Sequence, residues 1–203
     1  MKKLGFLMLL LVSALMLGGT ALAQDTDWYF TTYYSNANTA NAPDATVRII
    51  NDGAALAIGN GNLWADFYVF DDSEELTECC SCLITPDGLL SESVNKNLTA
   101  NPITGIKPTR GVIKVISSIT PDASTVYNGT TGVGVIPGLH GWATHVQKLT
   151  SGFAVTETLL ADSNLSGITL PPFGEVLLLE QLCYFDKLLS GQPCTCTPED
   201  QDF

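Results

Sequence analysis

The chain has 203 residues, with 21 acidic against 9 basic side chains and a formal net charge of −12 at pH 7. Such an acidic surface repels phosphate backbones and argues against nucleic acid as a partner. Charged residues are sparse while Gly, Ser, Thr and Asn are plentiful, a composition typical of exported β-proteins.

The first 23 residues have the pattern of a secretory signal peptide. Two lysines open it, an apolar run follows from Leu4 to Leu17, and Ala21-Leu22-Ala23 is a small-residue cleavage motif. The run is too short for an ordinary membrane-spanning helix. We expect cleavage before Gln24, leaving one domain over residues 24–203 with no transmembrane segment.

Short segments of alternating or β-branched residues predict strands along the chain. Residues 63–70 carry apolar or aromatic side chains on both faces, so this strand is expected to be buried on both sides. The other predicted strands cover residues 46–50, 89–97, 111–117, 131–136, 152–160 and the region around Ile168. About seven short strands separated by Gly, Pro and Asn predict a mainly β fold, an Ig-like β-sandwich.

Two segments predict helices. Asp72-Ser73-Glu74-Glu75 resembles a capping box, so a short helix is expected through Leu76 towards Cys80. A C-terminal helix is expected at about 175–190, with Gly191 just beyond its end. Its apolar residues recur at helical spacing, namely Val176, Leu179, Leu182, Cys183, Phe185 and Leu189. Cys183 is then expected to face the core.

The cysteines form two clusters far apart in the sequence, Cys79, Cys80 and Cys82 in one and Cys183, Cys194 and Cys196 in the other. Export places thiols in an oxidising compartment, so all six are expected to form disulfides that join the two clusters. Which cysteine pairs with which stays open, because six cysteines allow fifteen connectivities.

Two other interpretations of the cysteines are open. A helical turn would place Cys79 and Cys82 on one face, where a four-thiolate metal site with Cys194 and Cys196 could form. The segment from Cys79 to Cys82 is also a redox C-x-x-C motif, although it closes the expected helix instead of opening one. Because export favours oxidation, we predict neither a metal site nor a redox site.

No familiar catalytic motif occurs in the sequence. His140 and His145, the only histidines, are five residues apart and so lie on opposite faces of a strand. Capping and solvation account for the acidic cluster of Asp66, Asp71, Asp72, Glu74 and Glu75. A glycosidase stays open, because its two carboxylates can be far apart in sequence. We expect no catalytic residues and no cofactor.

Aromatic residues gather near the mature N-terminus, and with one later tryptophan they could form a platform for sugar rings: Trp28, Tyr29, Tyr33, Tyr34 and Trp142. Alternatively, the N-terminal aromatics pack a first strand into the sandwich. A third interpretation is that this strand adds to the sheet edge of a neighbouring subunit.

Several segments together resemble an uncharacterised family of predicted secreted bacterial proteins with a C-C-x-C cluster and a C-terminal C-x-C. They are Phe70 to Glu75 continuing to Cys79-Cys80-Ser81-Cys82, Leu98 to Pro102, Gly111 to Lys114, Phe153 to Glu157, and Cys194-Thr195-Cys196. The resemblance covers most of the mature chain and implies bacterial export. It implies no functional residue, because the family has no established activity.

These patterns predict a secreted structural or adhesive protein, extracellular or at the cell surface, with the periplasm as the alternative location. It is expected to be non-catalytic and able to self-assemble, with copies of itself or extracellular glycans as partners. The main alternative is a carbohydrate- or ligand-binding module. A hydrolase, or a metal or redox protein, is a further alternative.

Overall fold

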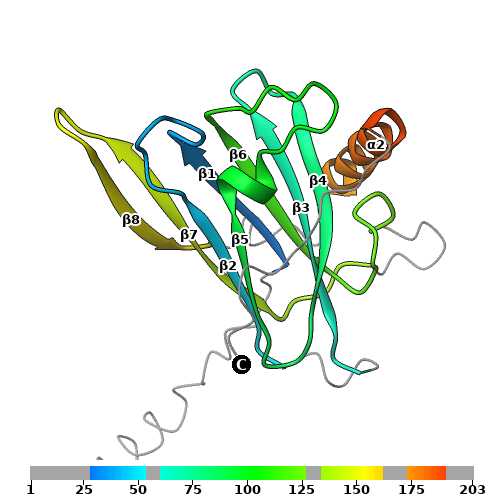
Figure 1. The fold of residues 1–203 in the computed structure, drawn as a ribbon. Helices are drawn as coiled ribbons and strands as arrows, with labels where there is room; N and C mark the ends of the chain where they lie inside the picture. Colours follow the sequence, from blue (N-terminus) through cyan, green and yellow to red (C-terminus); the bar gives the residue numbers. More distant parts are fainter. Residues whose placement is uncertain (1–27, 54–59, 127–133, 162–172, 191–203) are drawn as a thin grey trace, which may run out of the picture.

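The computed structural model describes residues 28–53, 60–126, 134–161 and 173–190. Within these ranges the chain forms eight β-strands, a short π-helix and one long α-helix (Figure 1). The prediction of a mainly β fold is therefore confirmed, with eight strands in place of about seven. The Ig-like connectivity stays a prediction.

The strands form two four-stranded sheets in which all neighbours are antiparallel. Sheet A has the order β1-β6-β3-β4, with bounds Tyr29–Ser35, Arg110–Ser118, Leu63–Asp71 and Leu76–Ile84. Sheet B has the order β5-β2-β7-β8, with bounds Leu89–Ser93, Thr46–Asn51, Leu139–Lys148 and Phe153–Leu159. The π-helix η2, Val94–Leu98, follows β5.

The main core lies between the two sheets. Every second residue of β3 enters it, and sheet B contributes the opposite wall. The residues concerned on β3 are Leu63, Ala65, Phe67 and Val69, all fully buried, and those from sheet B include Ile49 and Leu139.

A second, smaller core lies on the outer face of sheet A, under the helix α2 (Phe173–Ser190). Tyr68 of β3 packs there with Val176 and Leu179 of the helix. The predicted burial of β3 on both faces is thus confirmed, and so are the C-terminal helix and the inward direction of Cys183, which is fully buried. Gly191 lies outside the described residues.

The helix expected from Asp72 towards Cys80 is wrong, because this segment is a β-hairpin. The Oδ1 atom of Asp71 accepts hydrogen bonds from the amides of Ser73 and Glu75, at 2.8 and 3.1 Å. Glu74 adopts a left-handed φ of 66° in the same turn. The acidic side chain therefore closes a turn instead of capping a helix, and β4 begins directly after it at Leu76.

Three other segments differ from expectation. The strand predicted over 89–97 ends at Ser93, because the Ser93 hydroxyl accepts from the Lys96 amide at 3.0 Å and starts η2. The sequence did not indicate β7. Of the strand predicted over 131–136, the described part makes a single bridge between Val135 and Ser118. The signal segment and the region around Ile168 lie outside the described residues.

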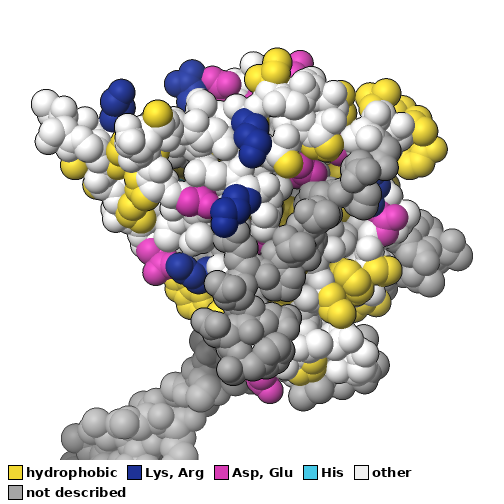
Figure 2. Space-filling model, viewed as in Figure 1, with side chains coloured by type: hydrophobic (Ala, Val, Ile, Leu, Met, Phe, Trp, Pro, Cys, Tyr) yellow, Lys and Arg dark blue, Asp and Glu magenta, His cyan; other side chains and the backbone are white. Residues whose placement is uncertain are grey.

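The outer surface of α2 is unexpectedly apolar. Two residues of its periodic pattern, Phe185 and Leu189, are 56% and 69% exposed. Figure 2 shows hydrophobic side chains gathered over this helix. No helix within the described ranges is long and apolar enough to cross a membrane.

Candidate functional site

The candidate site is the buried polar cluster between sheet A and α2, built around a disulfide. Cys79 of β4 and Cys183 of α2 are bonded with an S–S distance of 2.13 Å and a Cα–Cα distance of 5.7 Å. Both residues are fully buried, and the bridge joins positions 104 residues apart. It therefore fastens the helix to the sheet, as the two-cluster pattern predicted.

Cys80 and Cys82 face the opposite side of β4, because successive side chains of a strand alternate. Both are also disulfide-bonded, so no cysteine in the described ranges is a free thiol. Cys194 and Cys196 lie outside these ranges. Cys79 and Cys82 thus lie on opposite faces, and neither offers a thiolate to a metal or to redox chemistry. The described residues contain no group of three or more potential ligands that could hold a metal ion.

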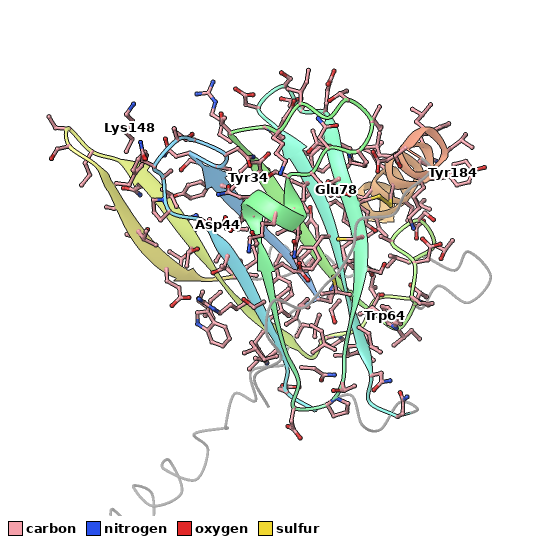
Figure 3. The ribbon with its side chains drawn as sticks, in the orientation of Figure 1. Tyr34, Asp44, Trp64, Glu78, Lys148 and Tyr184 are labelled. Carbon is pink, nitrogen blue, oxygen red and sulfur yellow. A yellow bond between two sulfur atoms is a disulfide. The ribbon has the colours of Figure 1, made fainter. Side chains whose placement is uncertain are left out.

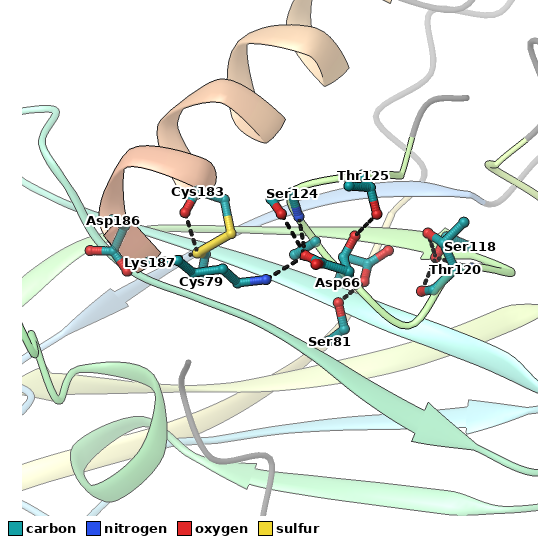
Figure 4. Close-up of polar contacts among 12 residues, drawn as sticks. Asp66, Cys79, Ser81, Ser118, Thr120, Ser124, Thr125, Cys183, Asp186 and Lys187 are labelled. Carbon is teal, nitrogen blue, oxygen red and sulfur yellow. Dashed lines mark hydrogen bonds and ion pairs between the residues drawn. A yellow bond between two sulfur atoms is a disulfide. The ribbon is translucent and has the colours of Figure 1, made fainter. Parts of the chain in front are cut away.

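Asp66 is the central carboxyl of the cluster. It lies on β3, fully buried, and the Ser81 hydroxyl of the neighbouring strand donates to its Oδ1 atom (Figure 4). Its Oδ2 atom has no hydrogen-bond partner in the structure. Burial raises the pKa of Asp66 from 3.8 to about 8, against the opposing effects of Ser118, Ser81 and Lys187. Asp66 is therefore largely protonated at neutral pH.

Lys187 of α2 pairs with Asp122 of the loop after β6. Its ammonium donates to Asp122 Oδ1, which also accepts from the amide and the hydroxyl of Ser124, at 2.8 and 2.6 Å (Figure 4). Burial opposes ionisation of Asp122, but these hydrogen bonds outweigh it and hold the pKa of Asp122 below its ordinary value. Tyr68 donates to the Ala123 carbonyl at 2.6 Å, so the loop is held beneath the helix.

Two further buried carboxyls are close to the disulfide cysteines in the sequence, Glu78 next to Cys79 and Asp186 three residues after Cys183. Burial raises the pKa of Glu78 from 4.5 to about 8, and the charge of Asp186 adds to the shift. Neither oxygen of Glu78 makes a hydrogen bond of ordinary geometry, although the amides of Cys79 and Asn101 oppose the shift. Burial also raises the pKa of Asp186, whose Oδ2 lies 3.8 Å from the Cys79 sulfur. Glu78 is labelled on β4 in Figure 3.

The cluster thus contains two carboxyls, Asp66 and Glu78, whose pKa is raised to about 8. Both histidines lie elsewhere, on β7. His145 is buried, stacks on Tyr33 at 4.1 Å between ring centroids, and lies 2.7 Å from the Thr158 hydroxyl. His140 contacts Asp52 at 3.1 Å.

The structure does not bring the five candidate sugar-binding aromatics together. Trp28 and Tyr29 pack into the small core under α2, and their ring centroids are 5.9 Å apart. Tyr34 is buried in the main core and donates to the Phe70 carbonyl at 3.1 Å. Tyr33 is 46% exposed beside His145, and Trp142 lies on β7 of the other sheet. They therefore form no single platform.

The sequence analysis did not predict that these carboxyls are buried. Solvation accounts for the exposed Asp72, Glu74 and Glu75, but it is the wrong explanation for Asp66. The available signal was its position between apolar and aromatic residues in a strand with two buried faces.

Compared with known proteins, the chain matches no family model and no curated protein. One solved structure is similar, described as "Crystal Structure of Thermotoga maritima 1070". The two are 12% identical with a TM-score of 0.40, over 66% of this chain and 91% of that chain. A likeness this weak supports no conclusion about function.

Replacing Cys79 and Cys183 together by alanine should lower the free energy of unfolding by at most about 4 to 5 kcal/mol, which is the value for a bridge that alone closes a loop of this length, because Cys80 and Cys82 keep disulfides of their own. Urea denaturation of the oxidised protein measures the change. Leu89→Ala, at an exposed position of β5, is the control. A loss as small as that of the control would contradict the prediction.

Stability should fall as the pH rises from about 4 to about 8. The folded state binds the protons of Asp66 and Glu78 more tightly than the unfolded chain, so their contribution is present below the ordinary pKa values and is lost towards pH 8. Asp66→Asn should make this decline shallower in urea denaturation across pH.

Asp122→Asn is the control. Because the pKa of Asp122 is lowered in the folded state, this carboxylate contributes stability that increases as the pH rises, so its removal should not make the decline shallower. Identical pH profiles for Asp66→Asn and the unmodified protein would refute the protonated state of Asp66.

Proposed function

We propose that this chain is a secreted, non-catalytic structural or adhesive protein that assembles with copies of itself through the free edge of sheet B. The disulfide bonding of Cys79, Cys80, Cys82 and Cys183 supports an oxidising location, extracellular or at the cell surface, and the periplasm offers the same chemistry. The exposure of strand β8 is the observation that carries self-assembly.

Strand β8 lies at the end of sheet B, on a hairpin that extends away from the rest of the sandwich (Figure 1). Val155 and Leu159 are 49% and 63% exposed, and the residues between them are exposed as well. Within the described ranges β8 pairs with β7 alone. Among these residues its outer backbone N–H and C=O groups have no strand partner, which is what pairing with a further strand requires.

The edge strand of sheet A on this side of the molecule, β1, is protected by contrast. The side chains of Ser35 and Asn36 donate to the Val146 carbonyl at 2.6 and 2.7 Å, which closes β1 against β7. All of β1 also pairs with β6 of its own chain, which argues against its donation to a neighbouring subunit.

Strand β8 lacks the usual protections of a free edge. Its sequence, Phe-Ala-Val-Thr-Glu-Thr-Leu, has no proline and no lysine. Its single charge, on Glu157, pairs with Arg48 at 2.6 Å. An antiparallel pair of β8 strands centred on Thr156 would place Val155 opposite Glu157 and keep the two glutamates apart. The partner that fits this edge is a second copy.

Val155→Glu should weaken self-association about tenfold or more, because each contact would then hold two pairs of facing carboxylates. Sedimentation velocity over a range of protein concentrations measures the association. Val155→Thr, which keeps the β-branched shape without charge, should associate as the unmodified protein does. A strictly monomeric unmodified protein at every concentration would refute self-assembly.

A second candidate function, glycan binding, is favoured by the outer face of sheet B. Trp142 lies there in one cross-strand row between Arg48 of β2 and Leu159 of β8. The Arg48–Glu157 ion pair beside it is exposed, with 42% and 48% of the side chains accessible. An indole for stacking next to charged hydrogen-bonding groups is a suitable chemistry for a sugar ring.

If the protein binds glycans, Trp142→Ala should reduce binding at least about tenfold on a glycan array, because the stacking surface is lost. Trp28→Ala, which alters an aromatic residue under α2, should leave binding unchanged. Equal loss in the two variants, or no glycan bound by the unmodified protein, would contradict a sugar site at Trp142.

A further inference from the structure

Helix α2 exposes large apolar side chains although it buries two carboxyls. The face against sheet A holds Glu180 and Asp186, which are only 7% and 3% exposed, together with the apolar Val176 and Leu179. The outer face carries six large apolar residues that are 39% to 69% exposed, namely Leu177, Leu178, Tyr184, Phe185, Leu188 and Leu189. A surface helix normally has polar side chains on its outer face, so the outer face of α2 has the composition of an interface. Tyr184 points away from the body of the molecule in Figure 3.

The outer face of α2 has the spacing of a helix–helix seam. Its residues fall into two adjacent rows, each with steps of four, three and four residues. One row is Leu178, Leu182, Phe185 and Leu189, and the other is Leu177, Gln181, Tyr184 and Leu188. This alternation of three and four is the pattern by which one α-helix packs against another. The pattern therefore indicates a helical partner.

No charged side chain of α2 belongs to its outer apolar face. Glu175 pairs with Lys114 and Lys187 pairs with Asp122, both within the same chain. The outer face thus presents no lysine or arginine, and the chain as a whole is strongly acidic, with a net charge of −12. A membrane surface attracts helices through basic side chains around the apolar face, so this face fits a protein partner better than a lipid one.

We propose that the outer face of α2 packs antiparallel against the same face of a second copy. A two-fold axis between Gln181 and Tyr184 would bring Leu177 of each copy beside Leu188 of the other. The six exposed side chains lie on one face of the helix, and a gathering of large apolar side chains on a surface marks a contact with another protein.

This contact, added to the proposed function at β8, determines the form of the assembly. In Figure 1 the helix and the β7–β8 hairpin lie at opposite ends of the molecule. Each contact alone is a two-fold contact that closes into a dimer. Two such contacts on opposite ends join copies alternately through strand and helix, which gives an open chain of subunits. The chain form rests on the proposed function, whereas the α2 contact does not.

Leu188→Glu tests the helix contact, because it places a charge in the apolar seam of both copies. Sedimentation velocity should show association through α2 weakened more than about tenfold. Leu89→Glu makes the same change at a residue of β5 that is 57% exposed, on the other sheet, and should leave association unchanged. Near-ultraviolet circular dichroism verifies that each variant is folded.

Adding Leu177→Lys to Leu188→Glu tests the direction of packing. In an antiparallel pair the lysine of one copy lies beside the glutamate of the other, so the double variant should recover association. Positions 177 and 188 are eleven residues apart on one helix and cannot pair within it. Disruption by Leu188→Glu without this recovery would overturn the antiparallel contact.

Combining the variants separates this inference from the proposed function. Val155→Glu alone should leave dimers joined through α2, Leu188→Glu alone should leave dimers joined through β8, and both together should give monomers. If Leu188→Glu associates as Leu89→Glu does, the α2 contact is refuted whatever Val155→Glu shows. If Val155→Glu has no effect while Leu188→Glu does, the β8 contact fails and the helix contact stands.

Discussion

The alternation of side chains along β4 is the constraint on which the two cores depend. Cys79 faces α2, while Cys80 and Cys82 face the space between the sheets, and all three are disulfide-bonded. One edge strand is therefore cross-linked on both of its faces. The bridge to Cys183 sets where α2 lies, and the helix in turn covers Tyr68 and Ile116, which would otherwise be exposed on the outer face of sheet A.

The polar groups under α2 explain why its apolar residues face outward. The inner face is occupied by the disulfide, by Asp186 and by the pairing of Lys187 with Asp122, leaving room for few apolar contacts such as Val176 and Leu179. Burying a carboxyl without a partner is unfavourable when it is charged, so Asp66 and Glu78 hold their protons instead. The helix is thus held by a disulfide and an ion pair in addition to its apolar contacts.

The strands and the long helix could be predicted where periodicity is strong, as in β3, β6 and α2. The first part of β4 was predicted as a helix because the same hydrogen bonds occur in two structures. An aspartate accepts hydrogen bonds from the backbone amides of the next few residues both in a helix cap and in a tight turn, and Asp71 closes a tight turn. The burial of Asp66 could not be predicted because the covering helix comes from the far end of the chain. The sequence could not show which face of α2 is exposed, because the helix carries apolar residues on most of its sides and the pattern does not distinguish the buried face from the exposed one.

The double coverage of β3 implies a gradient of local stability across the molecule. β3 lies between β6 and β4 and is buried on both faces, so its amides open to solvent only when the whole domain unfolds. At the opposite end, β8 pairs with one neighbouring strand and is largely exposed. Its amides should therefore exchange hydrogen with solvent through local opening, which requires little free energy. If β8 pairs with another chain as proposed, it is thus also the strand that gains the most order from the contact.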